Sequence, residues 1–556
     1  MAQTVIGKRF RSVFVASLAS MSISYVLILT DNVVAGQFVG DEAVAAMTLV
    51  SPLMTFVFFL SYMVADGLAM MFSYAKGRND RDKANELFGM GTIAAVALGV
   101  VLTIVFVAFD EKIMSVWKIS PHLMTYALDY YHGLMFIALP ALLNIYFYTI
   151  YIAEGEESIC VKASIAMFVV NMVLDILLAQ NFGVVGIGVA TTVGNLVSFL
   201  WHVPYLFSKK CQLKFGRYWN NREFAQGIFY SWYHSMDTLC LTLLPLIFAQ
   251  FTVWRFGEGE LIVVTVVNNL IALLIAIYTG LVDCLQPMVC QYHAEGALHS
   301  VTKTMRLGIS STIAVTLAII VFGMIFAEFL PGLFGVNREE ILYADAVLAA
   351  RIFLPFTLFL GVVLMFANYY IYIERLNLGA LLKFLLLLIL PSAGMFAGVY
   401  GSWQMWLGVG FSFVVALLAN KLLTHKNFGL LLIDPRALSQ QFSFDTPAAK
   451  ENFGALSKAL EEYFSRTKFA VGRKNFLTAL IAELFHAYAF RNEKPFQLEI
   501  SIIPAENAMT IIFRDNGKVL NPLESNVSPR LRQIFDSVRE KKYMIDGDEN
   551  KFVVVV

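Results

Sequence analysis

Long apolar stretches alternate with short polar connections from the N-terminus to about residue 425. Each is long enough for an α-helix to cross a bilayer, which needs about 20 residues. These stretches fall approximately at 13–35, 45–72, 89–109, 124–152, 160–179, 184–206, 226–254, 261–290, 306–330, 346–372, 378–398 and 402–424. The pattern therefore predicts twelve transmembrane helices, with the fifth and sixth joined by a tight turn.

The polar segment 207–225 divides these spans six and six, which suggests an internal repeat. A shift of 218 residues superimposes 38–50 on 256–268 and 73–77 on 291–295 without a gap. The matching segments occur in the same order in both halves. We therefore expect two six-helix lobes that arose by duplication.

After about residue 427 charged residues become frequent and no apolar run is long enough to span a membrane. Segments 447–466 and 473–491 have the pattern of amphipathic helices. FQLEISII (496–503) and MTIIFRD (509–515) read as the two strands of a hairpin, and KFVVVV as a final strand. The expected boundaries are 1–206 for the first lobe, 207–225 for the connecting loop, 226–426 for the second lobe and 427–556 for a small α+β domain.

Composition agrees with an all-α polytopic membrane protein carrying that α+β domain. The chain is 58% hydrophobic and 15% charged, with a mean hydropathy of +0.67, whereas soluble domains have about 25% charged residues. The formal net charge is zero, which gives no argument for a nucleic-acid partner. The five cysteines lack C-x-x-C spacing and are expected to be buried hydrophobic residues.

Basic residues in alternate connections predict the orientation. They precede the first span and follow the second and sixth spans, whereas 36–44 carries only Asp41 and Glu42 as charged residues. The positive-inside rule then places both termini and the C-terminal domain in the cytosol, with the chain in the cytoplasmic membrane. The residues concerned are Lys8, Arg9, Arg11, Lys76, Arg78, Arg81, Lys83, Lys209, Lys210, Lys214, Arg217 and Arg222.

The most conspicuous polar residues in apolar surroundings are Asp31, Asn171, Asp175 and Thr191. Asn171 and Asp175 are four apart and therefore share a helix face. An ionisable group within a span is costly and usually faces a cavity or a partner. Two carboxylates, an amide and a hydroxyl have the oxygen ligands to bind Na⁺, or the carboxylates to hold a proton, so we expect a cation site.

These motifs resemble those of the MATE (multidrug and toxin extrusion) transporters. The resemblance rests on TDNVVAG in the first span, N-x-x-x-D in the fifth, GVVGIGVAT leading into the sixth, and LVDCLQPMVCQYHAEGA in the eighth. It implies Na⁺- or H⁺-coupled efflux of small organic, often cationic, compounds by a membrane protein that is not an enzyme. It also maps the coupling-cation site onto Asp31, Asn171, Asp175 and Thr191. Position 249, which the repeat pairs with Asp31, is Ala, so coupling is expected to be asymmetric.

Further intramembrane polar residues are secondary candidates for transport. His234 and Asp237 are three apart in the seventh span, which suits a proton relay or a cation-binding patch. Asp66 lies near the end of the second span, where its side chain is expected to reach the membrane surface. Asp283 is expected to pair with Arg351 between the eighth and tenth spans.

The C-terminal domain resembles the GHKL ATPase domain of histidine kinases and anti-sigma-factor kinases. IAELFHAYAF (481–490) and RDNGKVLNPLE (514–524) match its helix and adenine-binding motifs, which the resemblance maps onto Glu483, Asp515 and Gly517. The Mg²⁺-binding position is Ala487, and no glycine lies between Gly517 and Gly547 where a phosphate lid is expected. A degenerate domain with a regulatory or protein-binding role is therefore expected. No P-loop occurs in the chain, and transport is expected to need no nucleotide or other cofactor.

Two other functions stay open at this stage. One is a flippase for lipid-linked oligosaccharides or lipids in the same superfamily, whose members commonly have more basic cavities. The other is a transporter-like sensor that signals through the C-terminal domain to a cytosolic partner.

Overall fold

The structure is a computed structural model of the 556-residue chain. It describes residues 4–115, 120–216, 218–334, 336, 338, 341–467, 469, 471–491, 496–505, 508–517, 521–523, 528–547 and 549–556. Arg217 of the basic connection, and 518–520 and 524 of the predicted adenine-binding motif, lie outside the described residues.

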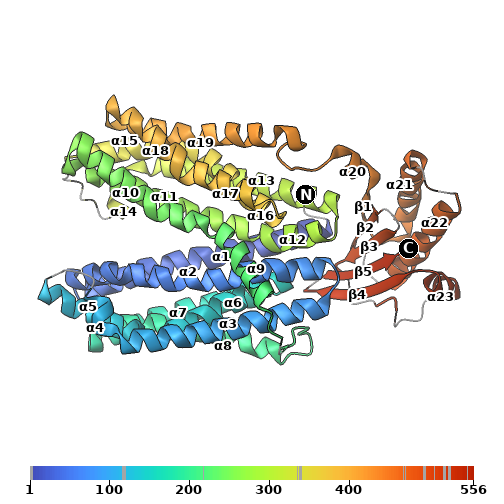
Figure 1. Ribbon diagram of the computed structural model, residues 1–556, viewed down its shortest axis with the longest axis horizontal. Helices are drawn as coiled ribbons and strands as arrows, with labels where there is room; N and C mark the ends of the chain where they lie inside the picture. Colours follow the sequence, from blue (N-terminus) through green and yellow to red (C-terminus); the bar gives the residue numbers. More distant parts are fainter. Residues whose placement is uncertain are drawn as a thin grey trace.

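The first half of the chain forms one helical bundle, drawn blue to cyan-green in Figure 1. Its helices are α1 (Val5–Phe38), α2 (Asp41–Gly77), α3 (Arg81–Ala108), α4 (Asp110–Met114), α5 (Pro121–Leu134), α6 (Ala138–Glu154), α7 (Glu157–Phe182) and α8 (Val184–Leu206). Helix α1 packs mainly on α7 but also reaches α11 and α13 of the second half. It therefore lies at the border between the two halves.

The second half forms a second bundle beside the first (Figure 1). Its helices are α9 (Asn221–His234), α10 (Met236–Phe256), α11 (Leu261–Asp283), α12 (Leu285–Ala294), α13 (Leu298–Ile325), α14 (Leu330–Leu333), α15 (Tyr343–Phe353), α16 (Thr357–Tyr372), α17 (Leu376–Phe384), α18 (Leu390–Met395) and α19 (Ser402–Thr424). We call α1–α8 the first bundle and α9–α19 the second bundle.

Among the described residues, 11 helices are long and apolar enough to cross a membrane, or 12 when a bent pair counts as one span. The bent pair is α5 and α6, which meet at 53° near residues 135–137. Each predicted apolar stretch corresponds to one of these spans. The prediction of a polytopic helical membrane protein is confirmed.

The C-terminal residues form a five-stranded antiparallel sheet in the order β1-β2-β3-β5-β4. The strands are β1 (Phe442–Pro447), β2 (Gln497–Pro504), β3 (Met509–Asp515), β4 (Glu540–Asp546) and β5 (Glu549–Val555), and the helices are α20 (Pro435–Gln440), α21 (Phe453–Arg466), α22 (Val471–Arg491) and α23 (Pro529–Asp536). The predicted hairpin of β2 and β3 pairs Ile500 with Phe513 and is confirmed. The sequence analysis missed β1, β4, α20 and α23.

Both faces of the sheet are covered, because successive strand residues point to opposite sides. Ile500 and Phe513 pack in a core with α21 and α22, whereas Ile503, Ile512 and Val553 join the core of the transmembrane bundles. Figure 1 shows the sheet against one end of both bundles, with α21, α22 and α23 on its far side. We call this end of the bundles the sheet end and the opposite end the open end.

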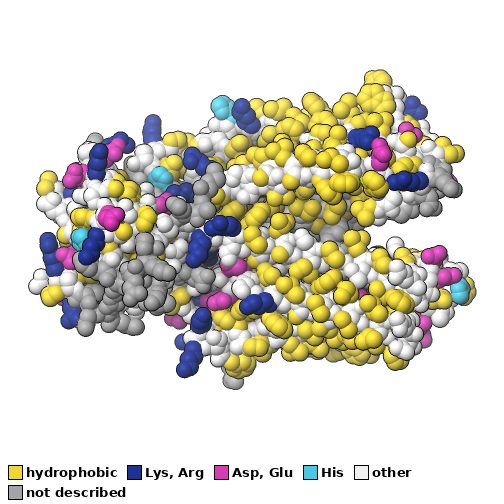
Figure 2. All heavy atoms as spheres, turned by 180° about the vertical axis from the view of Figure 1, so that it is seen from behind, with side chains coloured by type: hydrophobic (Ala, Val, Ile, Leu, Met, Phe, Trp, Pro, Cys, Tyr) yellow, Lys and Arg dark blue, Asp and Glu magenta, His cyan; other side chains and the backbone are white. Residues whose placement is uncertain are grey.

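The bundles are parted at the open end, where Figure 2 shows the molecule hollowed between them. At the sheet end they are in contact. The Tyr74 hydroxyl of α2 donates to the Tyr372 carbonyl of α16 at 2.9 Å, and the Gly67 N–H of α2 donates to Ser231 Oγ of α9 at 2.6 Å.

Candidate functional site

The four residues predicted to form a cation site come together inside the first bundle. Asp31 comes from α1, Asn171 and Asp175 from α7, and Thr191 from α8. All are buried, with exposed fractions between 0% for Asp175 and 7% for Thr191. Sequence spacing could place Asn171 and Asp175 on one helix face, and the fold adds Asp31 and Thr191 from two other helices.

The turn between α7 and α8 brings Thr191 back beside Asn171. Gly183 ends α7 with a φ of +60°, a conformation that side chains other than hydrogen disfavour. Three residues later a Cβ on Gly186 would lie 2.5 Å from the carbonyl carbon of Leu178, so α8 approaches α7 as closely as backbone contact allows. Glycine at these two positions is therefore what permits the site to form.

Asn171 connects the two carboxyl groups. With Nδ2 turned toward them, it donates to Asp31 Oδ1 and to Asp175 Oδ2, each at 3.0 Å, and its oxygen accepts from the Thr191 N–H at 3.2 Å. The Thr191 hydroxyl lies 3.4 Å from Asp31 Oδ2. In the opposite orientation the Asn171 amide oxygen, rather than its N–H groups, would face the carboxyl oxygens of Asp31 and Asp175. A metal cation between these oxygens would favour that orientation, and without such a cation the first orientation is favoured.

The carboxyl groups of Asp31 and Asp175 lie side by side, because both accept from the same Asn171 amide. Among the described residues neither carboxyl group forms an ion pair with a cationic side chain. Asp175 Oδ1 is buried without a hydrogen-bond partner among the described residues. Two ionised carboxylates cannot lie in contact in such surroundings unless a proton or another cation compensates them.

A separate cavity of about 170 Å³ lies between the first bundle and the junction of α11 and α12. Asp66 and Asp283 line it together with several hydroxyl groups, among them those of Ser20 and Tyr148. Asp66 is 6% exposed, and its Oδ2 lies 3.0 Å from His234 Nδ1. The expectation that Asp66 reaches the membrane surface is therefore wrong, because its carboxylate is buried against a histidine of the other bundle.

Two further expected pairings also differ in the structure. His234 does not pair with Asp237, because its ring lies between Asp66 and the Tyr372 hydroxyl, the latter at 3.1 Å. Asp237 instead lies 3.5 Å from Lys383 Nζ. Arg351 of α15 contacts Glu328 at 3.2 Å rather than Asp283. Glu328 lies in the short turn Ala327–Phe329, and both residues of this pair lie toward the open end. Asp283 has no hydrogen bond or ion pair to another side chain among the described contacts, and it faces the cavity.

Comparison with known proteins identifies the family. The MatE family model matches residues 16–177 and 235–391, which is more than half of the chain and includes α1, α7 and the broken span of α11 and α12. The chain belongs to the MatE family. It is a multi-pass membrane protein with the MATE fold, and not an enzyme.

Individual relatives are distant. Over 216 residues the chain is 24% identical to the probable multidrug resistance protein YoeA of Bacillus subtilis (strain 168), a region that spans 36% of this chain and 46% of that protein. The protein in a crystal structure of MATE in complex with MaL6 is 20% identical in sequence to this chain. The match covers 75% of this chain and 95% of that one, with a TM-score of 0.69. A MOP superfamily transporter from Pyrococcus furiosus is 19% identical, with coverage of 77% and 97% and a TM-score of 0.70. These likenesses establish the MATE fold.

The family match ends at residue 391 and so does not reach the C-terminal sheet, whose resemblance to GHKL ATPases stays a prediction. The structure places Glu483 on α22, where it accepts from Ser528 at 2.8 Å, and Asp515 at the end of β3. Asp515 accepts from the Gly517 N–H at 2.9 Å and from Asn550 at 2.8 Å, and burial raises the pKa of Asp515 to about 6. Both predicted nucleotide-binding carboxyl groups thus have partners within the chain.

Sequence reasoning missed Lys383 and Tyr372, the two residues that complete the polar contacts of His234 and Asp237. Lys383 is fully buried and donates to the His234 carbonyl. A lysine in the apolar run 380–390 is a signal that could have been found, because charged residues inside spans are rare and usually paired. The contact of His234 with Tyr372 had no such signal, since it depends on how the bundles meet.

Proposed function

We propose that this MatE-family protein exports small organic cations by proton-coupled antiport. The observation that carries the proposal is that the buried carboxyl groups of Asp31 and Asp175 both accept from the Asn171 amide, each at 3.0 Å. A pair of this kind holds a proton in one state and releases it when the surroundings become polar, which couples proton movement to a change of conformation. Basic connections at the sheet end support a cytosolic position for that end.

We propose H⁺ rather than Na⁺ as the coupling ion, because two neighbouring buried carboxyl groups can bind a proton without any further ligand. Sodium would need additional oxygen ligands. The Asn171 amide would provide one only in the orientation that turns its oxygen toward the carboxyl groups of Asp31 and Asp175.

Asp283 and the cavity around it are proposed to bind the positive charge of the substrate. Its carboxylate faces a cavity with room for an ammonium or similar group, and Asp66 adds a second carboxylate. A short polar chain lies between this cavity and the proton site, because Asn144 of the cavity is 3.5 Å from Asn195, which donates to the Thr191 carbonyl at 3.0 Å. The same segment of α8 thus contacts both sites.

Measuring which ion gradient drives transport tests this function. The purified full chain would be reconstituted into liposomes that hold the membrane potential at zero with valinomycin and equal potassium, so that ethidium does not distribute by potential. We expect an acidic interior to drive ethidium uptake by exchange with protons, whereas a sodium gradient at equal pH produces none. Uptake driven by sodium at equal pH would contradict proton coupling, and uptake driven by neither gradient would contradict antiport.

Replacement of Asp283 by Asn is expected to raise the apparent KM for ethidium roughly tenfold, because it removes one charge-assisted contact. The maximal rate and the requirement for a pH gradient should change little, since the proton site is separate. Asp237→Asn is the matched control, because that carboxylate is near Lys383 and does not line the cavity. An unchanged KM in Asp283→Asn, or an equal rise in both variants, would contradict this role.

A further inference from the structure

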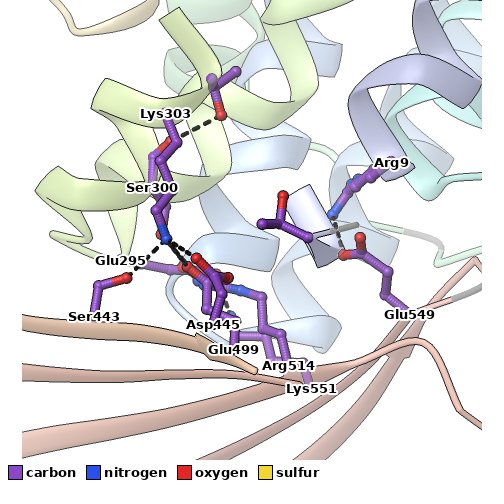
Figure 3. A network of polar contacts seen from close by, with 12 residues as sticks. Arg9, Glu295, Ser300, Lys303, Ser443, Asp445, Glu499, Arg514, Glu549 and Lys551 are labelled. Atoms are coloured by element: carbon purple, nitrogen blue, oxygen red, sulfur yellow. Dashed lines mark hydrogen bonds and ion pairs between the residues drawn. The ribbon is translucent and has the colours of Figure 1, made fainter. Parts of the chain in front are cut away.

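The face of the C-terminal sheet that meets the bundles carries buried charges. Glu499, Arg514 and Lys551 alternate with the apolar residues of β2, β3 and β5, and each is at most 2% exposed. Figure 3 shows these side chains between the strands and the transmembrane helices. Buried charges are costly without partners, so their partners define how the sheet is held.

The second bundle provides most of these partners. Arg514 Nη1 lies 2.9 Å from Glu499 within the sheet, and its other Nη contacts Glu295, which follows α12. Lys551 contacts the same Glu295, and Lys303 of α13 contacts Asp445 of β1. Helix α19 also leads into the sheet domain through α20. The sheet is therefore attached to the second bundle by several ion pairs and by the chain itself.

The first bundle also contacts the sheet, since α1 packs on β2. Arg9 of α1 lies 3.4 Å from Glu549 at the start of β5, and both side chains are less than 10% exposed. The turn between β4 and β5 touches the connection after α6, because a Cβ on Gly547 would lie 2.3 Å from the Gly155 carbonyl oxygen. Figure 3 shows the Arg9–Glu549 pair apart from the group of contacts around Arg514.

The charges of this interface are complementary. Arg9 and Lys303 of the bundles contact Glu549 and Asp445 of the sheet, and Glu295 of the second bundle contacts Arg514 and Lys551. Each of these described charges thus faces a charge of opposite sign across the interface. Separation of the sheet from either bundle leaves buried charges uncompensated, which opposes that separation.

We propose that the C-terminal sheet is a clamp that holds the sheet ends of the two bundles together. The bundles are in contact at this end and parted at the other. Opening of the sheet end moves the first bundle away from the second, and it must break the Arg9–Glu549 contact while the attachments to the second bundle persist. Release of the sheet from the first bundle is then the step that controls how often this end opens. The proposal goes beyond antiport and does not depend on which ion drives it.

Cys290 is a native reporter for this step. It is fully buried on α12, a helix that packs on α2 of the first bundle. In the full-length protein in detergent, without substrate, the rate of Cys290 alkylation by N-ethylmaleimide would be followed by peptide mapping. We expect Glu549→Gln to accelerate this reaction roughly tenfold, because it removes the sheet charge that Arg9 of the first bundle contacts.

Asp445→Asn is the matched control, since it also removes a sheet carboxylate from a bundle cation but leaves the attachment through Glu295 intact. It should leave Cys290 alkylation within about twofold of the unmodified protein, given the small contribution of a partly exposed pair. The charge exchange Arg9→Glu with Glu549→Arg should restore slow alkylation. The clamp is contradicted if Glu549→Gln does not accelerate alkylation, or if Asp445→Asn accelerates it equally. It is also contradicted if the charge-exchange variant unfolds at the normal temperature but its Cys290 is still alkylated rapidly.

Discussion

Replacement of Asp175 by Asn is expected to reduce proton-driven export at least about 100-fold, since removing a transport carboxylate removes the group that binds the proton. Asparagine has nearly the same volume and keeps an oxygen for the Asn171 amide, so the packing of α7 on α8 should persist. Asp31→Asn should have the same effect, because either replacement leaves a single carboxyl group. The measurement is ethidium uptake driven by an acidic liposome interior.

Asp345→Asn is the control for this experiment, as Asp345 is an exposed carboxylate on α15 of the second bundle. It should transport at the normal rate. The thermal unfolding temperature of each variant would show that loss of transport is not loss of structure. Retention of pH-driven uptake in Asp175→Asn would contradict the assignment of the proton site.

Arg514→Met is expected to cause the largest loss of stability in the C-terminal region. It leaves Glu295 and Glu499 buried without their shared cation, and removal of one partner of a buried pair costs about 3–5 kcal/mol. Burial alone would lower the pKa of Arg514, but the two glutamates raise it, so the guanidinium is charged in the folded protein. The guanidinium also lies 4.8 Å from the centre of the Tyr292 ring, a contact that methionine would not reproduce.

The readout for Arg514→Met is limited proteolysis between α19 and β1, the segment that joins the sheet to the second bundle. We expect rapid cleavage there, with the transmembrane bundles left intact. Arg466→Met is the control, because Arg466 is 73% exposed in its pair with Glu462 and such surface pairs contribute about 1 kcal/mol or less. Equal cleavage of the two variants would show that the buried pairs do not hold the sheet.

The transmembrane spans could be predicted from the sequence because each is a continuous apolar run long enough to cross a bilayer. The hairpin of β2 and β3 could also be predicted, since two segments of alternating apolar and polar residues flank a short polar turn. The strand β1 could not, because it pairs with β2, from which α21 and α22 separate it in the chain. The strand β4 pairs with the adjacent β5, but its charged residues Glu540, Lys541, Lys542 and Asp546 obscure an alternating apolar pattern.

The candidate cation site was predictable to the extent that its residues are polar ones in apolar surroundings. Asp31, Asn171 and Asp175 are polar residues in apolar runs, and the glycines before Thr191 mark a tight turn. Partner choice was not predictable for His234, because the Asp66 and Tyr372 groups that flank it come from α2 and α16. Contacts between the bundles depend on how the two bundles pack together, which the spacing of residues within one helix does not reveal.

The charges that attach the sheet were missed for a related reason. Glu499 and Arg514 lie in strands where charged residues would ordinarily face water, and their burial follows from the second covered face of the sheet. A strand with polar residues on one side is typical of a half-exposed sheet. Only the position of that sheet against α12 and α13 shows that this side is buried.

The most direct test of proton-coupled antiport is the proton movement that substrate itself provokes. Liposomes containing the full chain, with no initial gradient and a trapped pH-sensitive dye, would receive ethidium outside at zero membrane potential. We predict that ethidium entry makes the interior more alkaline in the unmodified protein and in Asp345→Asn, and that Asp175→Asn produces no change of pH. Ethidium entry without proton movement in the unmodified protein, or equal proton movement in Asp175→Asn, would contradict the account.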